Sequence, residues 1–494
     1  MAKRATIPFD TLVIEPNGET PLTRQLYNLL RHHITGGRIP IGTRLPSTRA
    51  LSQQLGIGRN TVLAAYDQLL AEGYVKSETG SGTWVAFSPA IPTSRPASIL
   101  AQPKLSRRGE ILAKEPQMPR SPKTLNFQPG FPETITFPYS TWSRLLSQNA
   151  RQRGGDMVGY YDYAGHQCLR QAIATYIGVA RGVECDPEQV IVVTGAQAAL
   201  DLVSRVVLDE DDQVWIEDPG YLGAHSALLG GGARLSALRV DRNGWNLDDP
   251  ALPPPRAIYV TPACQWPLGL TMGVNERMRL LALAEMHNAW VIEDDYDGEY
   301  RFRGRPVPAL YGLDRSSRVI YIGTFGKILF SSLRLGFLVV PRGLSDSFGR
   351  AISVTGQFAP LLLQSTLADF MQEGHFAAHL RRMRRLYARR QAMLIDLCER
   401  HLGSWVSITA NDAGMQLLAN LLPPWDDRLI TSAARLHGVD VQPVSMNYRY
   451  QTPEHGLLLG FAALDEKNMH AAIAGLQATF RDLDAGAPKS GSSK

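Results

Sequence analysis

The sequence is poor in cysteine and has no long uninterrupted hydrophobic segment. Its four cysteines, Cys168, Cys185, Cys264 and Cys398, are far apart and show no CxxC spacing. A disulfide framework or a zinc site needs paired or closely spaced thiols, so we expect reduced thiols and no metal. No run of about eighteen apolar residues is present, which excludes a helix long enough to cross a bilayer.

The first residues also lack the features of an export signal. Residues 1–10 are basic, but no apolar stretch follows them, so we expect a cytoplasmic protein with no membrane partner. The net charge of +5 is modest for 494 residues and by itself says little about nucleic acid. A chain of this length exceeds one ordinary hydrophobic core, which predicts a multidomain protein.

Composition divides the chain into three parts. Residues 10–88 combine helical apolar spacing with a glycine-rich strand pair, and residues 125–485 alternate strands with helices. Between them, residues 89–124 are rich in proline, serine and basic side chains and poor in aromatic ones, so they predict a linker without a core. Two interpretations of this linker are open: a solvated tether, or a basic segment that lies along DNA.

The N-terminal part predicts a winged helix-turn-helix. Apolar residues on one face from Leu22 to Ile34 indicate a first helix; Ser47 is a natural N-cap for a second, and a third begins near Arg59 after a glycine turn. The stretch YVKSETGSGTWV then predicts a hairpin wing, of the kind that enters a minor groove. We assign four residues to the core of this domain: Leu63, Tyr66, Leu69 and Leu70.

The same stretch is similar to a known motif. From Gly42 to Val85 it resembles GxxLPSxRxLxxxLGxxRxTVxxAYxxLxxEGYxxxxxGxGTxV of the GntR superfamily of winged-helix repressors. The resemblance implies DNA contacts from six residues: Arg49, Arg59, Asn60, Thr61, Lys76 and Gly82. Guanidinium groups bind guanine or phosphate in a bidentate manner, and helix N-termini attract phosphate, although a single arginine is also typical of a solvated surface.

The C-terminal part predicts an α/β domain. Five β-branched runs, QVIVVTG, QVWIED, AIYVTP, AWVIEDD and RVIYIGT, are separated by helical stretches such as ERMRLLALAEMH. Short apolar strands that alternate with helices indicate a mostly parallel sheet covered on both faces.

Several of these strands end in residues suited to a carbonyl cofactor that carries a phosphate. Lys327 follows RVIYIGT, with Thr324 before it and Arg334 after it, which suits a Schiff-base lysine near a phosphate site. AWVIEDD ends in three adjacent acids. Because strand side chains alternate between two faces, only the acid or acids on one face can bind a protonated pyridine nitrogen. TGAQAALDL offers backbone amides to a phosphate, and Tyr221 offers an aromatic face for stacking.

Each of these residues also has a purely structural interpretation. Lys327 is alternatively a surface lysine at a strand end, Asp294 a cap or an ion-pair partner, and Arg334 part of a structural salt bridge. Tyr221 and Tyr160 are alternatively packing residues.

Together the motifs resemble the fold type I aminotransferases, and specifically the MocR-type (GabR-like) regulators of the GntR superfamily. The similarity extends from Leu22 to Leu464. It implies pyridoxal 5'-phosphate (PLP) as cofactor, with Lys327 as Schiff base, Asp294 on the pyridine nitrogen, Tyr296 on the ring hydroxyl and Tyr221 stacked on the ring. It places the remaining contacts around the phosphate: Gly195, Ala196, Gln197, Thr324, Arg334 and, from a partner subunit, Tyr160.

The sequence departs from this family at several positions. The segment TPACQWPLG has Cys264 and Trp266 where a histidine and a phenylalanine are common, and Gly326 replaces a frequent serine. Met446 stands where amino-acid-binding members carry an arginine, and a thioether cannot clamp a carboxylate. Arg449 is one substitute; an effector without an ordinary carboxylate, or PLP itself, is another interpretation.

The resemblance implies a homodimeric transcription regulator that binds a double-stranded DNA operator and PLP. Its effector is the cofactor itself, or an amine or amino acid that forms an external aldimine. The alternative is a PLP-dependent aminotransferase with an appended DNA-binding domain. Turnover needs an anchor for the substrate carboxylate, and Met446 does not supply one, so we expect a sensor without productive turnover.

Overall fold

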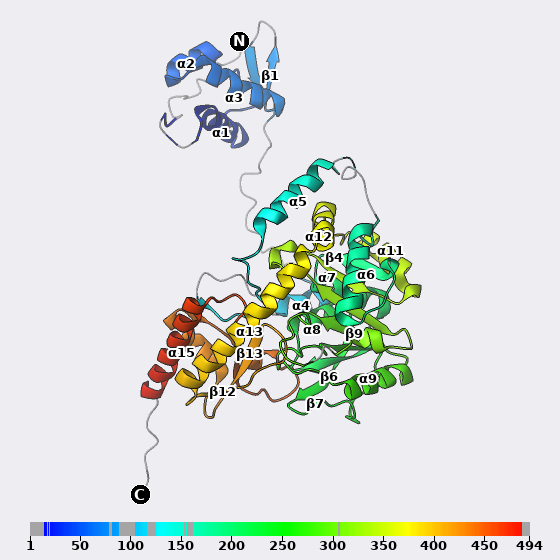
Figure 1. Cartoon of the computed structure of the whole chain (residues 1–494). Helices are drawn as coiled ribbons and strands as arrows, with labels where there is room; N and C mark the ends of the chain where they lie inside the picture. Colours follow the sequence, from blue (N-terminus) through cyan, green and yellow to red (C-terminus); the bar gives the residue numbers. More distant parts are fainter. Residues whose placement is uncertain are drawn as a thin grey trace. The chain divides into compact units, whose positions relative to one another are not determined.

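The chain forms two compact units, Met1–Lys104 and Leu105–Lys494 (Figure 1). The computed structural model describes residues 14–78, 82–87, 104–115, 125–152, 155, 162–304 and 307–486, except residues 17 and 19. None of the helices in these ranges has both the length and the apolar character needed to span a membrane. All four cysteines are free, as the sequence predicted.

The N-terminal unit is a winged helix-turn-helix, as predicted. Its helices are α1 (Leu22–Thr35), α2 (Thr48–Leu55) and α3 (Arg59–Ala71), and its wing pairs β1 (Val75–Glu78) antiparallel with β2 (Gly82–Val85). Ser47 caps α2, because its hydroxyl accepts a hydrogen bond from the Ala50 amide at 3.2 Å. Gly56 ends α2 in the left-handed region, with φ of 66°, which glycine adopts without strain.

Two of the four residues assigned to the core of this unit are not in it. Tyr66 and Leu69 are buried, but Leu63 and Leu70 are 48% and 43% exposed. The buried face of α3 is Val62, Ala65, Tyr66 and Leu69, which follows the helical repeat. Leu63 and Leu70 are each one residue beyond that repeat, so the prediction for these two was wrong.

The C-terminal unit is built on an eight-stranded sheet, in the order β4-β11-β10-β9-β8-β5-β6-β7. Its strands are β4 (Val190–Val193), β5 (Gln213–Asp218), β6 (Arg234–Asp241), β7 (Gly244–Trp245), β8 (Ala257–Val260), β9 (Trp290–Asp295), β10 (Val319–Thr324) and β11 (Gly336–Val339). Five neighbouring strands pair in parallel, in the order β10, β9, β8, β5 and β6. Strand β11 runs antiparallel to both of its neighbours, β10 and β4. The predicted, mostly parallel sheet is confirmed.

Both faces of this sheet are covered. Along β4, Val190 and Val192 belong to one hydrophobic core, and Ile191 and Val193 belong to another. Each face therefore needs its own layer of helices. The helices before and around the sheet are α5 (Tyr139–Gln152), α6 (Gln167–Arg181), α7 (Ala196–Val207), α8 (Leu222–Gly230), α9 (Val274–Met286), α10 (Leu310–Leu313), α11 (Ser345–Thr355) and α12 (Leu361–Gln372).

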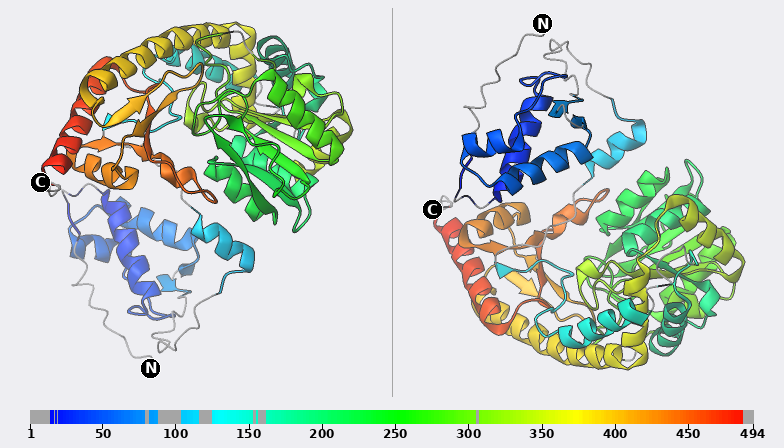
Figure 2. Two further views of the ribbon diagram at one scale, coloured as in Figure 1. Left: turned by 90° about the horizontal axis from the view of Figure 1, so that it is seen from below. Right: turned by 90° about the horizontal axis from the view of Figure 1, so that it is seen from above.

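A second, smaller sheet follows the long helix α13 (His375–Leu402). It is antiparallel, in the order β12-β13-β16-β15, and α13 lies next to α15 (Glu466–Gly486) beside it (Figure 2). The remaining bounds are β12 (Val406–Ile408), β13 (Gln416–Leu421), α14 (Asp427–Ala434), β15 (Gln442–Pro443) and β16 (Gly456–Gly460), with the pair β3 (Leu125–Asn126) and β14 (Val439–Asp440). The sequence analysis did not predict this second sheet.

Part of the predicted linker is an ordered helix of the C-terminal unit. Helix α4 (Arg107–Lys114) is capped by Ser106, whose hydroxyl accepts from the Gly109 amide at 3.1 Å, and packs on α8. Leu112 fills the space above Gly230, where an added Cβ would lie 3.0 Å from its Cδ2. A few apolar residues suffice for this docking, which composition alone did not indicate. Residues 88–103 and 116–124 lie outside the described residues.

Candidate functional site

Several of the predicted cofactor residues lie at one edge of the large sheet. Asp294 is near the end of β9, Lys327 follows β10, Tyr221 follows β5, and Gly195 follows β4. The carboxyl ends of parallel strands meet at the same edge, where open α/β sheets bind ligands. We call Lys327, Asp294, Tyr221 and residues 195–197 the strand-end site.

Lys327 is held by a backbone carbonyl. Its Nζ donates a hydrogen bond to the Gly130 oxygen at 2.9 Å. Burial lowers the pKa of the lysine, and the nearby carboxyl groups of Asp297 and Asp294 oppose that shift. Gly130 has φ of +77°, and a Cβ there would lie 2.4 Å from Nζ, so this position has no room for a side chain. A lysine with a lowered pKa more readily supplies the neutral amine that attacks a carbonyl.

Two of the three adjacent acids are engaged by structural partners. Glu293 accepts hydrogen bonds from the amides of residues 310 and 311 at 2.8 and 3.0 Å and pairs with the buried Arg277 at 3.4 Å. Asp295 pairs with Arg181 at 2.5 Å and accepts from a tyrosine hydroxyl at 2.7 Å. These two acids point to the same face because strand side chains alternate.

Asp294 points to the other face and has an unused oxygen. Its Oδ2 accepts a hydrogen bond from Tyr259 at 2.8 Å, but its buried Oδ1 has no hydrogen-bond partner among the described residues. Burial, against the opposing effects of Tyr259 and Lys327, raises the pKa of this carboxyl to about 7. An unpaired, buried carboxylate oxygen suits a cationic ring nitrogen, and this geometry separates Asp294 from its two neighbours.

The loop before α7 and the loop after β10 approach each other. Gly195 has φ of 122° and precedes the amides at the start of α7, and an added Cβ there would lie 4.0 Å from an Arg334 guanidinium nitrogen. Gln197 donates to the Gly223 carbonyl at 2.9 Å, and Thr324 accepts from the Gly326 amide at 3.3 Å. A helix N-terminus beside an arginine suits a phosphate group.

The three predicted tyrosines differ in where they lie. Tyr221 is the N-cap residue of α8 and makes no side-chain capping hydrogen bond there among the described residues; burial, together with the charge of Asp294, raises its pKa to about 12. Tyr296 accepts a hydrogen bond from Gln416 at 3.3 Å and packs edge-on against Trp266. Its predicted contact with a ring hydroxyl stays a prediction. Tyr160 lies outside the described residues.

Arg449, the predicted substitute at the carboxylate position, already has partners. Its guanidinium pairs with Glu115, the residue after α4, at 3.1 Å, and its amide donates to Asp218 at 2.7 Å. The same Glu115 oxygen accepts from the Ser226 hydroxyl at 2.9 Å and lies 3.6 Å from His225 Nδ1. Met446 is in the short helix Val444–Asn447, as a half-buried side chain.

The predicted DNA contacts lie on α2, α3 and the wing. Arg49, Arg59 and Asn60 are exposed, as is Lys76, whereas Thr61 is half-buried at the start of α3. Gly82 opens β2 with φ of +102°, and an added Cβ would lie 2.8 Å from Arg44 Nε. The guanidinium carbon of Arg44 also lies over the Trp84 ring, 5.8 Å from the ring centroid.

Sequence reasoning missed three residues at these sites: Gly130, Tyr259 and Arg44. Two of them could have been predicted from the sequence. Tyr259 lies on the neighbouring strand β8, and strand alternation puts its side chain on the same face as that of Asp294. Arg44 lies just before the capped helix α2. Nothing in the sequence predicts that Gly130 contacts Lys327, since 197 residues separate them.

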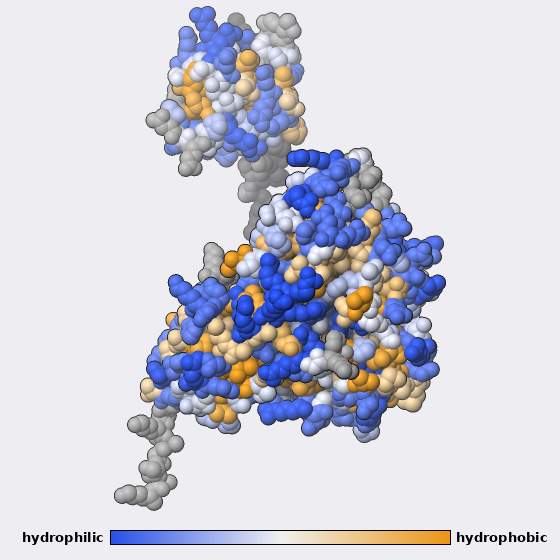
Figure 3. Space-filling view, in the orientation of Figure 1, coloured by the Kyte–Doolittle hydropathy of each residue, from blue (hydrophilic) through white to orange (hydrophobic). Residues whose placement is uncertain are grey.

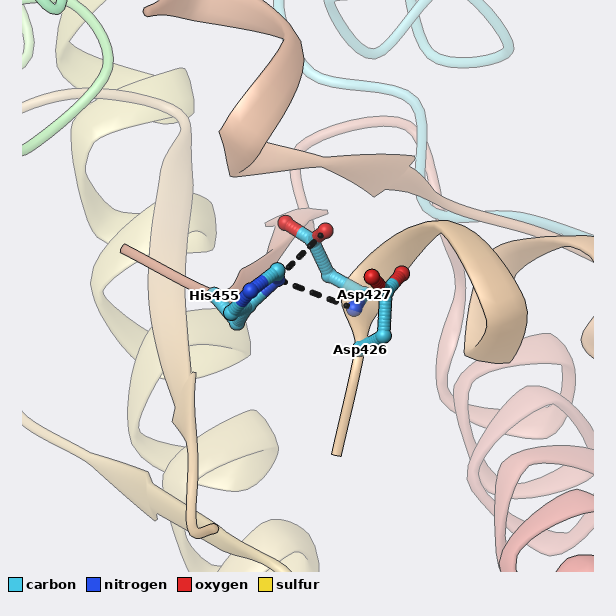
Figure 4. Close-up of side chains that lie close together, drawn as sticks. All are labelled: Asp426, Asp427 and His455. Atoms are coloured by element: carbon cyan, nitrogen blue, oxygen red, sulfur yellow. Dashed lines mark hydrogen bonds and ion pairs between the residues drawn. The ribbon is translucent and has the colours of Figure 1, made fainter. Parts of the chain in front are cut away.

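A separate cluster of Asp426, Asp427 and His455 has metal-ligand residue types (Figure 4). Its groups are used structurally. Asp426 caps α14 by accepting from two backbone amides at 2.8 and 3.1 Å, and the buried Asp427 accepts from the Ser445 amide at 2.9 Å. His455 Nδ1 lies 3.1 Å from Asp427. The cluster thus ties α14 to the loop before β16.

We expect Arg59→Ala to weaken binding to a selected DNA fragment by about 1 to 3 kcal/mol, the cost of losing a base contact. Arg59 is exposed at the N-terminus of α3, where a recognition helix reaches base edges. Fluorescence anisotropy at fixed salt measures the change. Arg24→Ala, which removes an exposed arginine from α1, is the matched control, and equal losses in both variants would contradict this role.

A winged helix-turn-helix followed by an aminotransferase-type sheet defines a DNA-binding regulator with an aminotransferase-like domain. Residues 22–85 match the family model of bacterial regulatory proteins of the gntR family, and residues 136–476 match that of aminotransferase class I and II. The chain belongs to the MocR-type transcription regulators of the GntR superfamily.

Two relatives and one solved structure illustrate the similarity. The "Probable rhizopine catabolism regulatory protein MocR" of Rhizobium meliloti is 50% identical over 96% of both chains. The "HTH-type pyridoxine biosynthesis transcriptional regulator PdxR" of Corynebacterium glutamicum is 30% identical over 94% of this chain and 97% of the relative. The structure of LysN, an alpha-aminoadipate aminotransferase from Thermus thermophilus, matches 74% of this chain and 94% of that one with a TM-score of 0.68 and 28% identity.

Proposed function

We propose that this regulator binds PLP at the strand-end site and that the occupancy of this site changes its affinity for operator DNA. The observation that carries the proposal is the pair formed by Lys327 and Asp294. Asp294 lies near the end of β9 and Lys327 follows the adjacent strand β10, and Asp294 has a buried oxygen without a hydrogen-bond partner among the described residues. The LysN structure, which this chain matches over 94% of its length, is a complex with N-(5'-phosphopyridoxyl)-L-leucine.

Each residue has a defined task in this proposal. PLP supplies an aldehyde that reacts reversibly with amines. Lys327 provides the amine, and Asp294 holds the ring nitrogen in its protonated form. The amides of residues 195–197, with Thr324 and Arg334, bind the phosphate. The side chains of Tyr221 and Tyr296 contact the ring face and the ring hydroxyl, and Tyr160 of the partner subunit completes a homodimeric site.

Regulation fits these contacts better than turnover does. An aminotransferase needs a cation to hold the substrate carboxylate. Met446 carries no charge, and Arg449 is paired with Glu115 at 3.1 Å. The effector is PLP itself or an amine whose recognition does not depend on a free arginine at these two positions.

Glu115 offers a route from the site to the rest of the chain. It follows α4, the first helix of the C-terminal unit, and its side chain is 13% exposed. Its partner Ser226 belongs to α8, which begins directly after Tyr221. Its partner Arg449 belongs to a loop whose backbone donates to Asp218. A ligand that shifts Tyr221 therefore also shifts the anchor of α4, and a ligand changes an equilibrium only through such a difference between states.

Glu115→Gln is expected to reduce the effect of PLP on DNA affinity. The variant keeps the shape of the side chain but loses charge-assisted hydrogen bonds worth about 1.5 to 3 kcal/mol. Hydrogen exchange at the α4 amides should then accelerate roughly tenfold or more, and the ratio of DNA dissociation constants with and without PLP should approach one. Glu110→Gln, an exposed position on the same helix, is the control. An unchanged ratio in Glu115→Gln would remove Glu115 from the route.

The cofactor assignment itself is tested by trapping. Purified protein is incubated with PLP, reduced with borohydride and digested, and the modified peptide is identified by mass spectrometry. We expect a single phosphopyridoxyl group on Lys327. Modification of scattered surface lysines, or none at saturating PLP, would contradict the proposal.

A further inference from the structure

The long helix α13 carries an unusual stripe of arginines. Arg381, Arg385 and Arg389 are spaced four residues apart, so they lie on one face of the helix, and all three are exposed. Figure 3 shows a strongly hydrophilic patch over the first half of α13. Among the residues that the structure describes, none of the three side chains has an ion pair or a side-chain hydrogen bond.

The acids nearest to the stripe along the chain are already paired. Glu373, just before α13, binds Arg144 at 2.8 Å, and Asp396, further along the helix, pairs with Arg400. Arg382, next to the stripe, is also exposed and donates to the Thr136 carbonyl at 2.6 Å, so it adds a fourth positive charge. Like charges four residues apart destabilise a helix. The stripe therefore costs stability unless an anion neutralises it.

The anion that fits is the phosphate backbone of DNA. The three arginines span about 12 Å along the helix axis. Each strand of a DNA duplex presents a phosphate about every 3.4 Å along the axis of the double helix, so several phosphates lie within reach of the stripe. Exposed alanines precede it, and no large apolar side chain of α13 is exposed. Protein interfaces usually need such an anchor, whereas DNA interfaces are polar and positively charged.

We propose that the arginine stripe of α13 is a second DNA-contacting surface, which binds backbone phosphates of DNA held by the winged helix-turn-helix. A second contact on the same chain is effectively intramolecular once the first has formed, so weak phosphate contacts become useful. Such contacts add affinity without adding sequence preference. This inference does not depend on PLP binding.

The test replaces Arg381, Arg385 and Arg389 with glutamine, which keeps helix propensity and removes three charges. Dissociation constants are measured between 50 and 200 mM salt, with the full-length protein, on a DNA fragment that it selects and on random DNA. Each phosphate contact contributes about 0.9 to the slope of log affinity against log salt, so the slope should fall by about 2.7. Over this fourfold range the wild type should lose roughly 40 times more affinity than the variant. The ratio of specific to random binding should stay the same.

A matched control removes the same charge elsewhere. Arg234, Arg279 and Arg342 are exposed, and each is paired with an aspartate. Their triple glutamine variant should keep the wild-type salt slope, and thermal unfolding should verify that both variants fold. An unchanged slope of log affinity against log salt in the α13 variant overturns the proposal. An acidic protein would then be the partner that the stripe fits. An equal fall in both variants also overturns it, because net charge and not a local contact would then be responsible.

Discussion

Lys327→Ala is expected to abolish covalent attachment of PLP while specific DNA binding by the cofactor-free protein is retained. The side chain supplies the only amine placed at the carboxyl ends of β9 and β10 among the described residues, and it donates to the Gly130 carbonyl. Alanine removes this amine and adds no bulk. The visible absorption band of the Schiff base should disappear, and borohydride should fix no cofactor to the chain.

Two controls sharpen this result. Lys327→Arg keeps the positive charge and the contact with Gly130, but a guanidinium does not form a stable imine, so it should also lose the band. Lys467→Ala, on α15 and away from the strand-end site, should keep it. Cofactor that borohydride fixes covalently to the Lys327→Ala chain would show that another lysine carries it.

Asp294→Asn is expected to weaken PLP binding by about 3 kcal/mol or more, which is roughly a hundredfold, because a buried cation loses its charged partner. The amide keeps the size of the side chain and the hydrogen bond with Tyr259. Fluorescence titration with PLP measures the loss. Wild-type affinity in the variant would mean that the ring nitrogen binds elsewhere.

The same substitution should stabilise the cofactor-free protein at neutral and alkaline pH. Burial raises the pKa of Asp294 to about 7, well above that of an unfolded aspartate, so the ionised carboxyl opposes folding as pH rises. The advantage of Asp294→Asn over wild type should therefore grow between about pH 4 and pH 7 and then level off. Asp295→Asn should instead destabilise, because it leaves Arg181 without its buried charge partner. Thermal unfolding across this pH range distinguishes the two carboxyls.

Local patterns predicted much of the fold. The five apolar runs are strands β4, β5, β8, β9 and β10, and the capping serine and the glycines delimit the three helices of the N-terminal unit. These features depend on residues that are close in the sequence, because strand alternation, helical spacing and capping are local patterns. The prediction for Leu63 and Leu70 was wrong because apolar character alone does not determine which face of a helix is buried.

Long-range contacts were beyond sequence reasoning. Leu125 pairs with Val439 in the two-stranded β3–β14 sheet, and Glu115 contacts Arg449, more than 300 residues away. Neither pairing has a local signal, because composition describes a stretch and not its partner. The three adjacent acids at the end of β9 also needed the structure. Strand alternation separates Asp294 from Glu293 and Asp295, but only their contacts show that the face of Glu293 and Asp295 is already paired with arginines.

The most direct test of the central claim compares DNA affinity with and without PLP. Full-length protein, freed of cofactor and then reloaded, is titrated against a DNA fragment that it selects, at fixed salt, with loading verified by borohydride trapping. A regulator that couples the strand-end site to DNA should show dissociation constants that differ by about 5- to 150-fold, the usual range of allosteric coupling. Equal dissociation constants for the loaded and unloaded protein would contradict the account and leave DNA binding without a PLP signal.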